Sequence, residues 1–152
     1  MTSRDIDRLQ AAALRRRPVY PGVLEVNAGT IAMAKAFVME KWIERAIELG
    51  RPTPIDLSNS CKFSSMFAQA IFGGRLEGHV DHQFVRLTDG SILDLNEDGA
   101  DVRAMANPHR HDARFWGNPE HAEALISCKP RVARWVEEFL VRAAYGSRKN
   151  AA

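Results

Sequence analysis

The apolar residues of this chain change their spacing twice along the sequence. They recur every three or four residues up to residue 72, form short runs rich in β-branched residues between residues 80 and 96, and return to the wider spacing after residue 119. The wider spacing gives a helix one apolar face, and the short runs are typical of strands. The sequence therefore predicts an α+β fold, in which several helices pack on a small, mostly antiparallel sheet.

The predicted helices are separated by residues that cap or break helices. Thr30 is predicted as the N-cap of the longest helix, and Gly50 stands where its left-handed terminating residue belongs. The second helix is predicted to begin near Asn59 or Ser60 and to end at the glycine pair 73–74. The predicted helices are residues 4–17, 30–49, 60–72, 120–127 and 131–145.

The length of the chain, 152 residues, is that of one domain with a single core. The sequence contains no internal repeat and no linker that would divide it in two. We therefore expect a single domain over residues 1–152. Within it, residues 1–20 are expected to form an N-terminal arm with a short helix, and residues 147–152 a frayed tail.

The composition excludes several classes of protein. Hydrophobic residues make up 45% of the chain and charged residues 26%, so overall disorder is excluded. A formal net charge of +2 does not indicate a nucleic-acid partner. The longest mostly apolar stretch, residues 31–38, is too short to cross a bilayer, and the N-terminus lacks the apolar segment of a secretory signal. We therefore expect no membrane partner. Because two cysteines cannot build a disulfide framework, we also expect a reducing compartment and hence a cytoplasmic protein.

Cys61 is predicted to lie in the first turn of the second helix. The unpaired amides and the positive dipole end of a helix N-terminus stabilise a thiolate, which is the nucleophilic form of cysteine. Cys61 points away from the apolar stripe of its helix, and the residues on its own side are small: Ser64, Ser65 and Ala68. Another element of the fold can therefore approach this side of the helix closely.

The two predicted strands are joined by Thr-Asp-Gly at residues 88–90, which suits a type I turn closed by a left-handed glycine. Such a three-residue loop puts His82, Asp94 and Asn96 on one face of the hairpin. A two-residue Asp-Gly loop would instead put His82 and Asp94 on opposite faces. The longer loop is favoured, and its register pairs Leu87 with Ser91, Arg86 with Ile92, Phe84 with Asp94, and His82 with Asn96.

A thiol at a helix N-terminus, an imidazole on a strand and a carboxylate on the next strand are the groups that nucleophilic catalysis needs. In this interpretation Cys61 is the nucleophile, His82 is the general base and acid, and Asp94 orients the imidazole and favours its charged form. Asn96 is the reserve candidate for the orienting group. The backbone N–H of Cys61 is a natural donor to an oxyanion, and Asn59 is a candidate for a second donor.

The order of these residues resembles the papain-like superfamily, and within it the transglutaminase-like and arylamine N-acetyltransferase-like branches, which share the order Cys, His, Asp. The resemblance is carried by Ser60-Cys61 with the helix after them, by residues 82–85 (His-Gln-Phe-Val) and by residues 92–96 (Ile-Leu-Asp-Leu-Asn). It implies a papain-like or transglutaminase-like core and a cysteine-dependent hydrolase or acyltransferase that needs no cofactor. The implied substrate is a protein or peptide, or a small acyl or amide compound, and the reaction is hydrolysis, deamidation or acyl transfer.

The sequence also leaves a structural role open for each of these residues. Cys61 would then be a small buried hydrophobic residue, and Asp94 would cap the loop that follows it. His79 rather than His82 would be the base if the chain turned differently. The alternative function is a non-catalytic, protein-binding adaptor domain with the same fold.

A second cluster of chemically useful residues follows the hairpin and consists of His109, His111, His121 and Cys128. Their spacing matches no zinc motif, and neither CxxC nor HExxH occurs in the chain. Solvated histidines in a polar loop are therefore favoured over a metal site, and no metal is expected. Nothing in the sequence indicates an oligomeric state.

Overall fold

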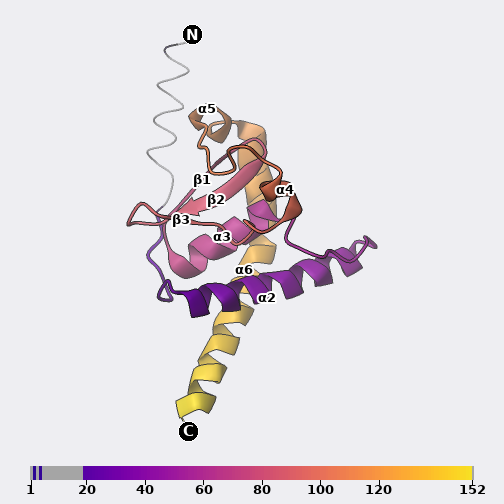
Figure 1. The fold of residues 1–152 in the computed structure, drawn as a ribbon, viewed down its shortest axis with the longest axis vertical. Coiled ribbons are helices and arrows are strands. Elements are labelled where there is room, and N and C mark those ends of the chain that lie inside the picture. The colour runs from indigo at the N-terminus through magenta and orange to yellow at the C-terminus, as the bar shows by residue number, and fades with distance from the viewer. Residues whose placement is uncertain (1, 3, 5–18, 152) are drawn as a thin grey trace.

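The structure is a computed structural model, and it describes residues 19–151 together with Thr2 and Arg4. The helices of this part are α2 (Ala28–Glu48), α3 (Cys61–Phe72), α4 (Ala100–Arg103), α5 (Ala113–Trp116) and α6 (Pro119–Ala151). The strands are β1 (Arg75–His79), β2 (His82–Arg86) and β3 (Ile92–Leu93). They form one antiparallel sheet in the order β1-β2-β3, on which helices pack (Figure 1), so the predicted α+β class is confirmed. Apart from Arg4, the helix predicted over residues 4–17 lies outside the described residues.

Helix α3 lies between the sheet and α6, and both of its sides are covered (Figure 1). Phe67 contacts rings of both other long helices, and Phe67 and Ile71 are fully buried. Ser65, one of the small residues predicted to permit a close approach, faces β2, and its hydroxyl accepts a hydrogen bond of 2.7 Å from the side chain of Gln83. The side chains after Cys61 therefore hold β2 directly against α3.

Helix α2 crosses α6 and completes the core (Figure 1). The Phe37 ring stacks on Phe67 with 5.5 Å between centroids and meets Phe139 edge-on at 5.2 Å. At the edge of the same contact, Lys41 of α2 forms an ion pair with Glu138 of α6. The lysine side chain is buried and the glutamate is exposed. Aromatic contacts at such distances stabilise a core beyond the area they bury.

The register of the β2–β3 hairpin follows the predicted three-residue loop. Arg86 pairs with Ile92, and the backbone N–H of Leu87 donates to the carbonyl of Ser91 at 2.8 Å. Gly90 adopts a φ of +88°, which is the left-handed conformation that this turn requires. Since β3 ends at Leu93, the predicted pairs beyond it lie outside the ladder.

Strand β1 has no counterpart in the prediction. It pairs with β2 through a two-residue turn, so that His79 lies opposite His82. Gly78 in β1 has a φ of +149°, and a Cβ atom there would lie 2.2 Å from the carbonyl oxygen of His82. Gly78 therefore permits the close approach of β1 to the residue that carries the candidate imidazole.

Three helix boundaries differ from the prediction. The N-cap of α2 is Asn27, and Thr30 is the third helical residue. The two form a capping box, in which the hydroxyl of Thr30 accepts from the backbone N–H of Asn27. The two helices predicted around Pro130 form the single helix α6, which runs on to Ala151 through the predicted tail. Gly50, with a φ of +64°, ends α2 as predicted.

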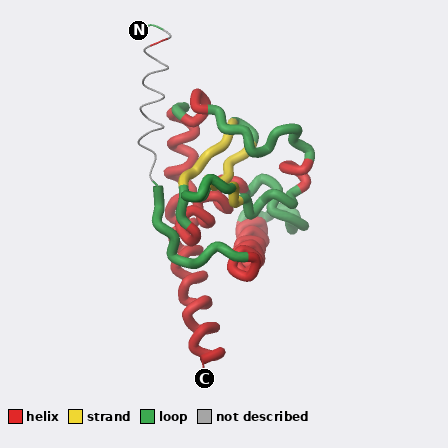
Figure 2. The backbone as a smooth tube through the Cα atoms, turned by 60° about the vertical axis from the view of Figure 1, so that its left-hand side comes forward, coloured by secondary structure: helices red, strands yellow, loops and turns green. Residues whose placement is uncertain are grey.

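The loop between β3 and α6 runs along the hairpin (Figure 2). The backbone N–H of Asp112 donates to the carbonyl of Gly78 at 2.8 Å, and the ring of His79 contacts the carbonyl of Pro108. These contacts hold the loop against β1. Among the described residues, no helix combines the length and the apolar character needed to cross a bilayer.

Candidate active site

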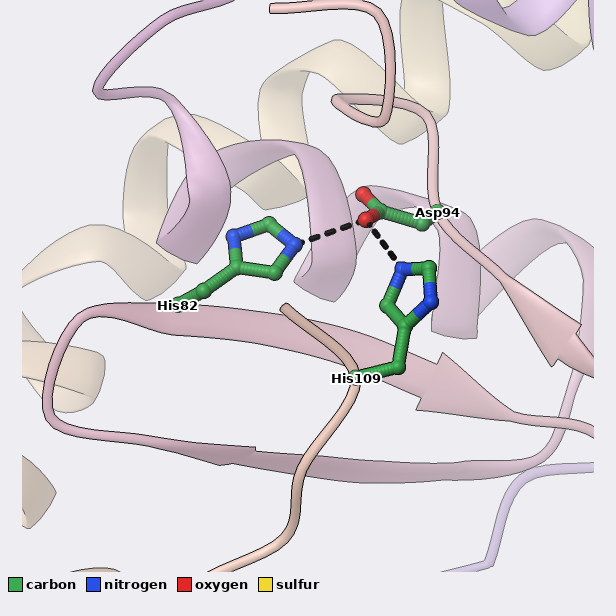
Figure 3. A group of neighbouring side chains, drawn as sticks. All are labelled: His82, Asp94 and His109. Carbon is green, nitrogen blue, oxygen red and sulfur yellow. Dashed lines mark hydrogen bonds and ion pairs between the residues drawn. The ribbon is translucent and has the colours of Figure 1, made fainter. Parts of the chain in front are cut away.

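His82 and Asp94 form a buried hydrogen bond next to the start of α3. The Nε2–H of His82 donates to Oδ2 of Asp94 at 2.7 Å (Figure 3), and both side chains are almost fully shielded from solvent. His82 is the first residue of β2, and Asp94 is the residue directly after β3. The three-residue hairpin loop thus sets the register that brings the two side chains together.

Both oxygens of Asp94 accept hydrogen bonds. Oδ1 accepts from the backbone N–H of Asn96 at 3.0 Å, which turns the chain away from β3 and fixes the carboxylate. Oδ2 accepts from His82 and also from the Nε2–H of His109 at 2.8 Å (Figure 3). A buried carboxylate with this many donors keeps its charge, because the donors replace the water that it has lost.

His109 comes from the loop between α4 and α5, and its ring meets Phe84 edge-on with 5.1 Å between centroids. Its side chain is 30% exposed, unlike that of His82. The sequence singled out His109 only as a weak zinc candidate. Its role at Asp94 depends on a loop that closes over the hairpin, and neither spacing nor periodicity signals such a closure.

Charge and burial shift the pKa values of His82 and Asp94 in opposite directions. Burial lowers the pKa of His82, but the hydrogen bond and charge of Asp94, together with the neighbouring thiol of Cys61, outweigh it and raise the pKa to about 9. For Asp94, burial raises the pKa, but His82, His109 and the Asn96 amide hold it below its ordinary value. The pair is therefore an imidazolium and a carboxylate at neutral pH.

Cys61 is the first residue of α3 and is partly exposed. Its thiol is one of the groups that raise the pKa of the His82 imidazole, so the two side chains are neighbours. Since Nε2 is bonded to Asp94, Nδ1 is the ring nitrogen left for the thiol, and it has no conventional hydrogen-bond partner among the described residues. Nδ1 is thus within electrostatic reach of the sulfur, without a formed hydrogen bond between them.

The segment that leads into Cys61 is fixed by polar contacts. Asn59 has a φ of +67°, and its backbone N–H donates to Asp101 at 2.8 Å. The hydroxyl of Ser60 donates to the carbonyl of Leu57 at 2.6 Å instead of capping α3. The first amides of α3 therefore receive no side-chain cap from Ser60, and the exposed side chain of Asn59 lines the cavity that Cys61 also lines.

Two candidate residues lie in other environments. The side chain of Asn96 is buried, and neither its oxygen nor its nitrogen has a hydrogen-bond partner among the described residues, so Asp94 and not Asn96 is hydrogen-bonded to His82. Both ring nitrogens of His79 face backbone groups, the carbonyl of Pro108 at 3.2 Å and the amide of Asp81 at 3.3 Å. The ring of His79 thus ties the β1–β2 turn to the loop.

The histidines of the second cluster are dispersed. His111 accepts from the backbone N–H of Gly78 at 3.1 Å, and His121 packs on Trp116 with 4.8 Å between centroids. In the described part of the chain, the set whose ligand atoms lie within 4.8 Å of one another is His82, Asp94 and His109.

Two imidazoles and a carboxylate are suitable ligands for zinc or iron. The contacts of 2.7 and 2.8 Å are, however, those of direct N–H to oxygen hydrogen bonds, and a bound ion would have to replace both of them. The arrangement is therefore already satisfied as a hydrogen-bonded carboxylate.

No protein-family model, curated protein or solved structure matches this chain. The chemistry of the site consequently rests on its own geometry.

Proposed function

We propose that this protein is a cysteine-dependent hydrolase or acyltransferase that acts on peptide, isopeptide or other amide bonds. The observation that carries the proposal is the buried hydrogen bond of 2.7 Å between His82 and Asp94, with the thiol of Cys61 as a neighbour of the same imidazole. A raised imidazole pKa favours a proton on the ring while the sulfur is a thiolate, which is the state that attacks a carbonyl carbon.

The reaction would run in two steps. The sulfur of Cys61 attacks the carbonyl carbon, and the amide C–N bond breaks as His82 gives its proton to the leaving nitrogen, which leaves a thioester. Water, or an acceptor amine or alcohol, then loses a proton to His82 and attacks the thioester carbon, so that the C–S bond breaks. The oxyanion of each step would accept from the backbone N–H of Cys61, with the side chain of Asn59 as the candidate second donor.

Asp94 and His109 would act through His82. Asp94 holds the ring with Nε2–H toward the carboxylate and Nδ1 available to the sulfur. His109 donates to the same carboxylate oxygen and so fixes its position.

The test is the alkylation of each cysteine by iodoacetamide as a function of pH, read by mass spectrometry of the separate peptides. Cys61 is expected to react at a pH well below that needed by Cys128, whose pKa is raised by burial. His82→Ala should remove most of the difference and leave the Cys128 rate unchanged. Equal and slow labelling of both thiols in the wild type would leave the non-catalytic adaptor as the better function.

A further inference from the structure

A cavity of about 400 Å³ opens beside Cys61. Its walls come from the end of α2, from Asn59 and the first residues of α3, and from residues 124–131 of α6. Cys61 therefore neighbours both the imidazole of His82 and this cavity. A substrate that reaches the sulfur would place the groups next to its scissile bond in the cavity.

The ionisable side chains that line the cavity, apart from the two thiols, are all cationic. They are Arg45, Lys62 and Arg131, and none of the described residues in the lining carries a carboxylate. Glu48, which lies outside the lining, accepts a bond of 2.8 Å from Arg131 and offsets one of these charges. Lys62 forms no ion pair among the described residues, so the walls carry an excess of positive charge.

Arg45 is held in place rather than free to swing into solvent. Its guanidinium lies 5.1 Å from the ring centroid of Trp42 and 4.8 Å from that of Phe63. Burial, followed by the charges of Arg51 and Arg131, lowers the pKa of Arg45. Like charges are therefore crowded around the cavity, and a bound anion would relieve their repulsion.

We propose that the cavity receives an anionic group of the substrate, so that Cys61 acts on acyl compounds that carry a negative charge close to the scissile bond. The inference rests on the proposed function, because it takes Cys61 as the nucleophile. Arg45 and Lys62 are the specificity-determining residues, and the first turn of α3 adds its positive dipole end to theirs.

Two alkylating reagents of nearly equal size test the charge preference. Iodoacetate carries a carboxylate and iodoacetamide a neutral amide, and with both the cysteine sulfur forms a C–S bond as the C–I bond breaks and iodide leaves. The quantity measured is the rate of Cys61 with iodoacetate divided by its rate with iodoacetamide. The same ratio for a small free thiol is the reference. Because a change in the thiolate population affects both rates equally, the ratio reports the charge of the cavity alone.

The wild-type ratio is expected to exceed that of the free thiol by about fivefold or more at low ionic strength, and to fall toward it as salt is added. Lys62→Gln should lower the ratio several-fold, and Arg45→Gln should also lower it. Lys129→Gln is the matched control, because Lys129 is an exposed lysine on α6 that lines a different cavity.

The outcomes separate the two proposals. If Cys61 reacts rapidly with iodoacetamide at low pH but its ratio equals that of the free thiol and is unchanged by Lys62→Gln, the anion preference is wrong and the proposed function stands. If Cys61 is no more reactive than Cys128 toward iodoacetamide, the proposed function fails. A ratio lowered equally by Lys62→Gln and Lys129→Gln would also contradict the inference, since the effect would then come from overall charge.

Discussion

Cys61 and Cys128 line the same cavity, yet they stand in different chemical surroundings. Cys61 begins a helix, is partly exposed and neighbours a buried imidazole. Cys128 lies in the interior of α6, is 8% exposed and has its pKa raised by burial. Shared access to a cavity therefore does not make two thiols alike. What distinguishes them is the imidazole that the β1–β2–β3 sheet brings to one of them.

Among the changes considered, Asp94→Asn should reduce the difference in reactivity between Cys61 and Cys128 most. Without the carboxylate, burial is opposed by Cys61 alone, and the pKa of His82 falls. At pH 7 the iodoacetamide rate of Cys61 should drop about tenfold or more, and the rate of Cys128 should be unchanged. The reason is that each unit by which the imidazole pKa falls lowers the ratio of charged to neutral imidazole tenfold. The free energy of unfolding should fall by about 1–3 kcal/mol, measured by urea titration, since buried donors lose a charged acceptor.

The matched control for this change is Asp112→Asn. Asp112 caps α5, and the amide oxygen of Asn can accept the same bonds, so this change removes a carboxylate while keeping the cap. A folded Asp94→Asn protein that keeps the wild-type difference between the two thiols would show that the carboxylate does not act on the imidazole.

The free energy of unfolding should also depend on pH through His82, and Cys61 should influence that dependence. The folded-state pKa of His82 is about 9, above the ordinary value of 6.5, so its stabilising contribution is full below about pH 6.5 and is lost as the pH rises through 9. The expected loss is roughly 3 kcal/mol at most. Cys61→Ser should make this slope shallower, because the thiol is one cause of the raised pKa.

Cys128→Ser is the control for the slope. An ordinary thiol titrates near pH 8.5, so Cys128 contributes only at the upper end of this range. The measurement is urea unfolding at several pH values between 6 and 9. Identical slopes in the wild type and in His82→Gln would contradict the assigned pKa.

His109→Gln should have the smallest effect. It removes one of two imidazole bonds to Asp94 and leaves the bond to His82 in place. We expect a two- to fivefold decrease in the Cys61 rate and a loss of about 1 kcal/mol in the free energy of unfolding. A decrease as large as that of Asp94→Asn would mean that His109, and not His82, is the main partner of the carboxylate.

The contact between His82 and Asp94 was predictable because it depends on local chemistry. The Thr-Asp-Gly loop selects its turn, the turn fixes the pairing of Arg86 with Ile92, and the pairing puts the two side chains on one face. The place of Cys61 at the start of α3 follows in the same way from the apolar period and the glycines that end the helix.

The features that sequence reasoning missed depend on long-range packing. Strand β1 contains a glycine and none of the β-branched residues or of Phe, Tyr and Trp, and it is held by pairing with β2 rather than by its own propensity. Pro130 interrupts the hydrogen bonds of α6 but does not end it, because Cys128, Val132 and Trp135 on either side of it bury one face of the helix. The contact of His109 with Asp94 joins residues from separate loops, and no local pattern encodes it.

The most direct test of the account is the titration of the His82 ring, followed by NMR of its ¹⁵N-labelled imidazole, in the wild type and in Cys61→Ser. The account predicts an apparent pKa near 9 in the wild type and a clearly lower value in Cys61→Ser, because the neighbouring thiol is one cause of the raised pKa. The same pKa in both proteins would mean that the thiol and the imidazole are not coupled, and would contradict the proposed chemistry.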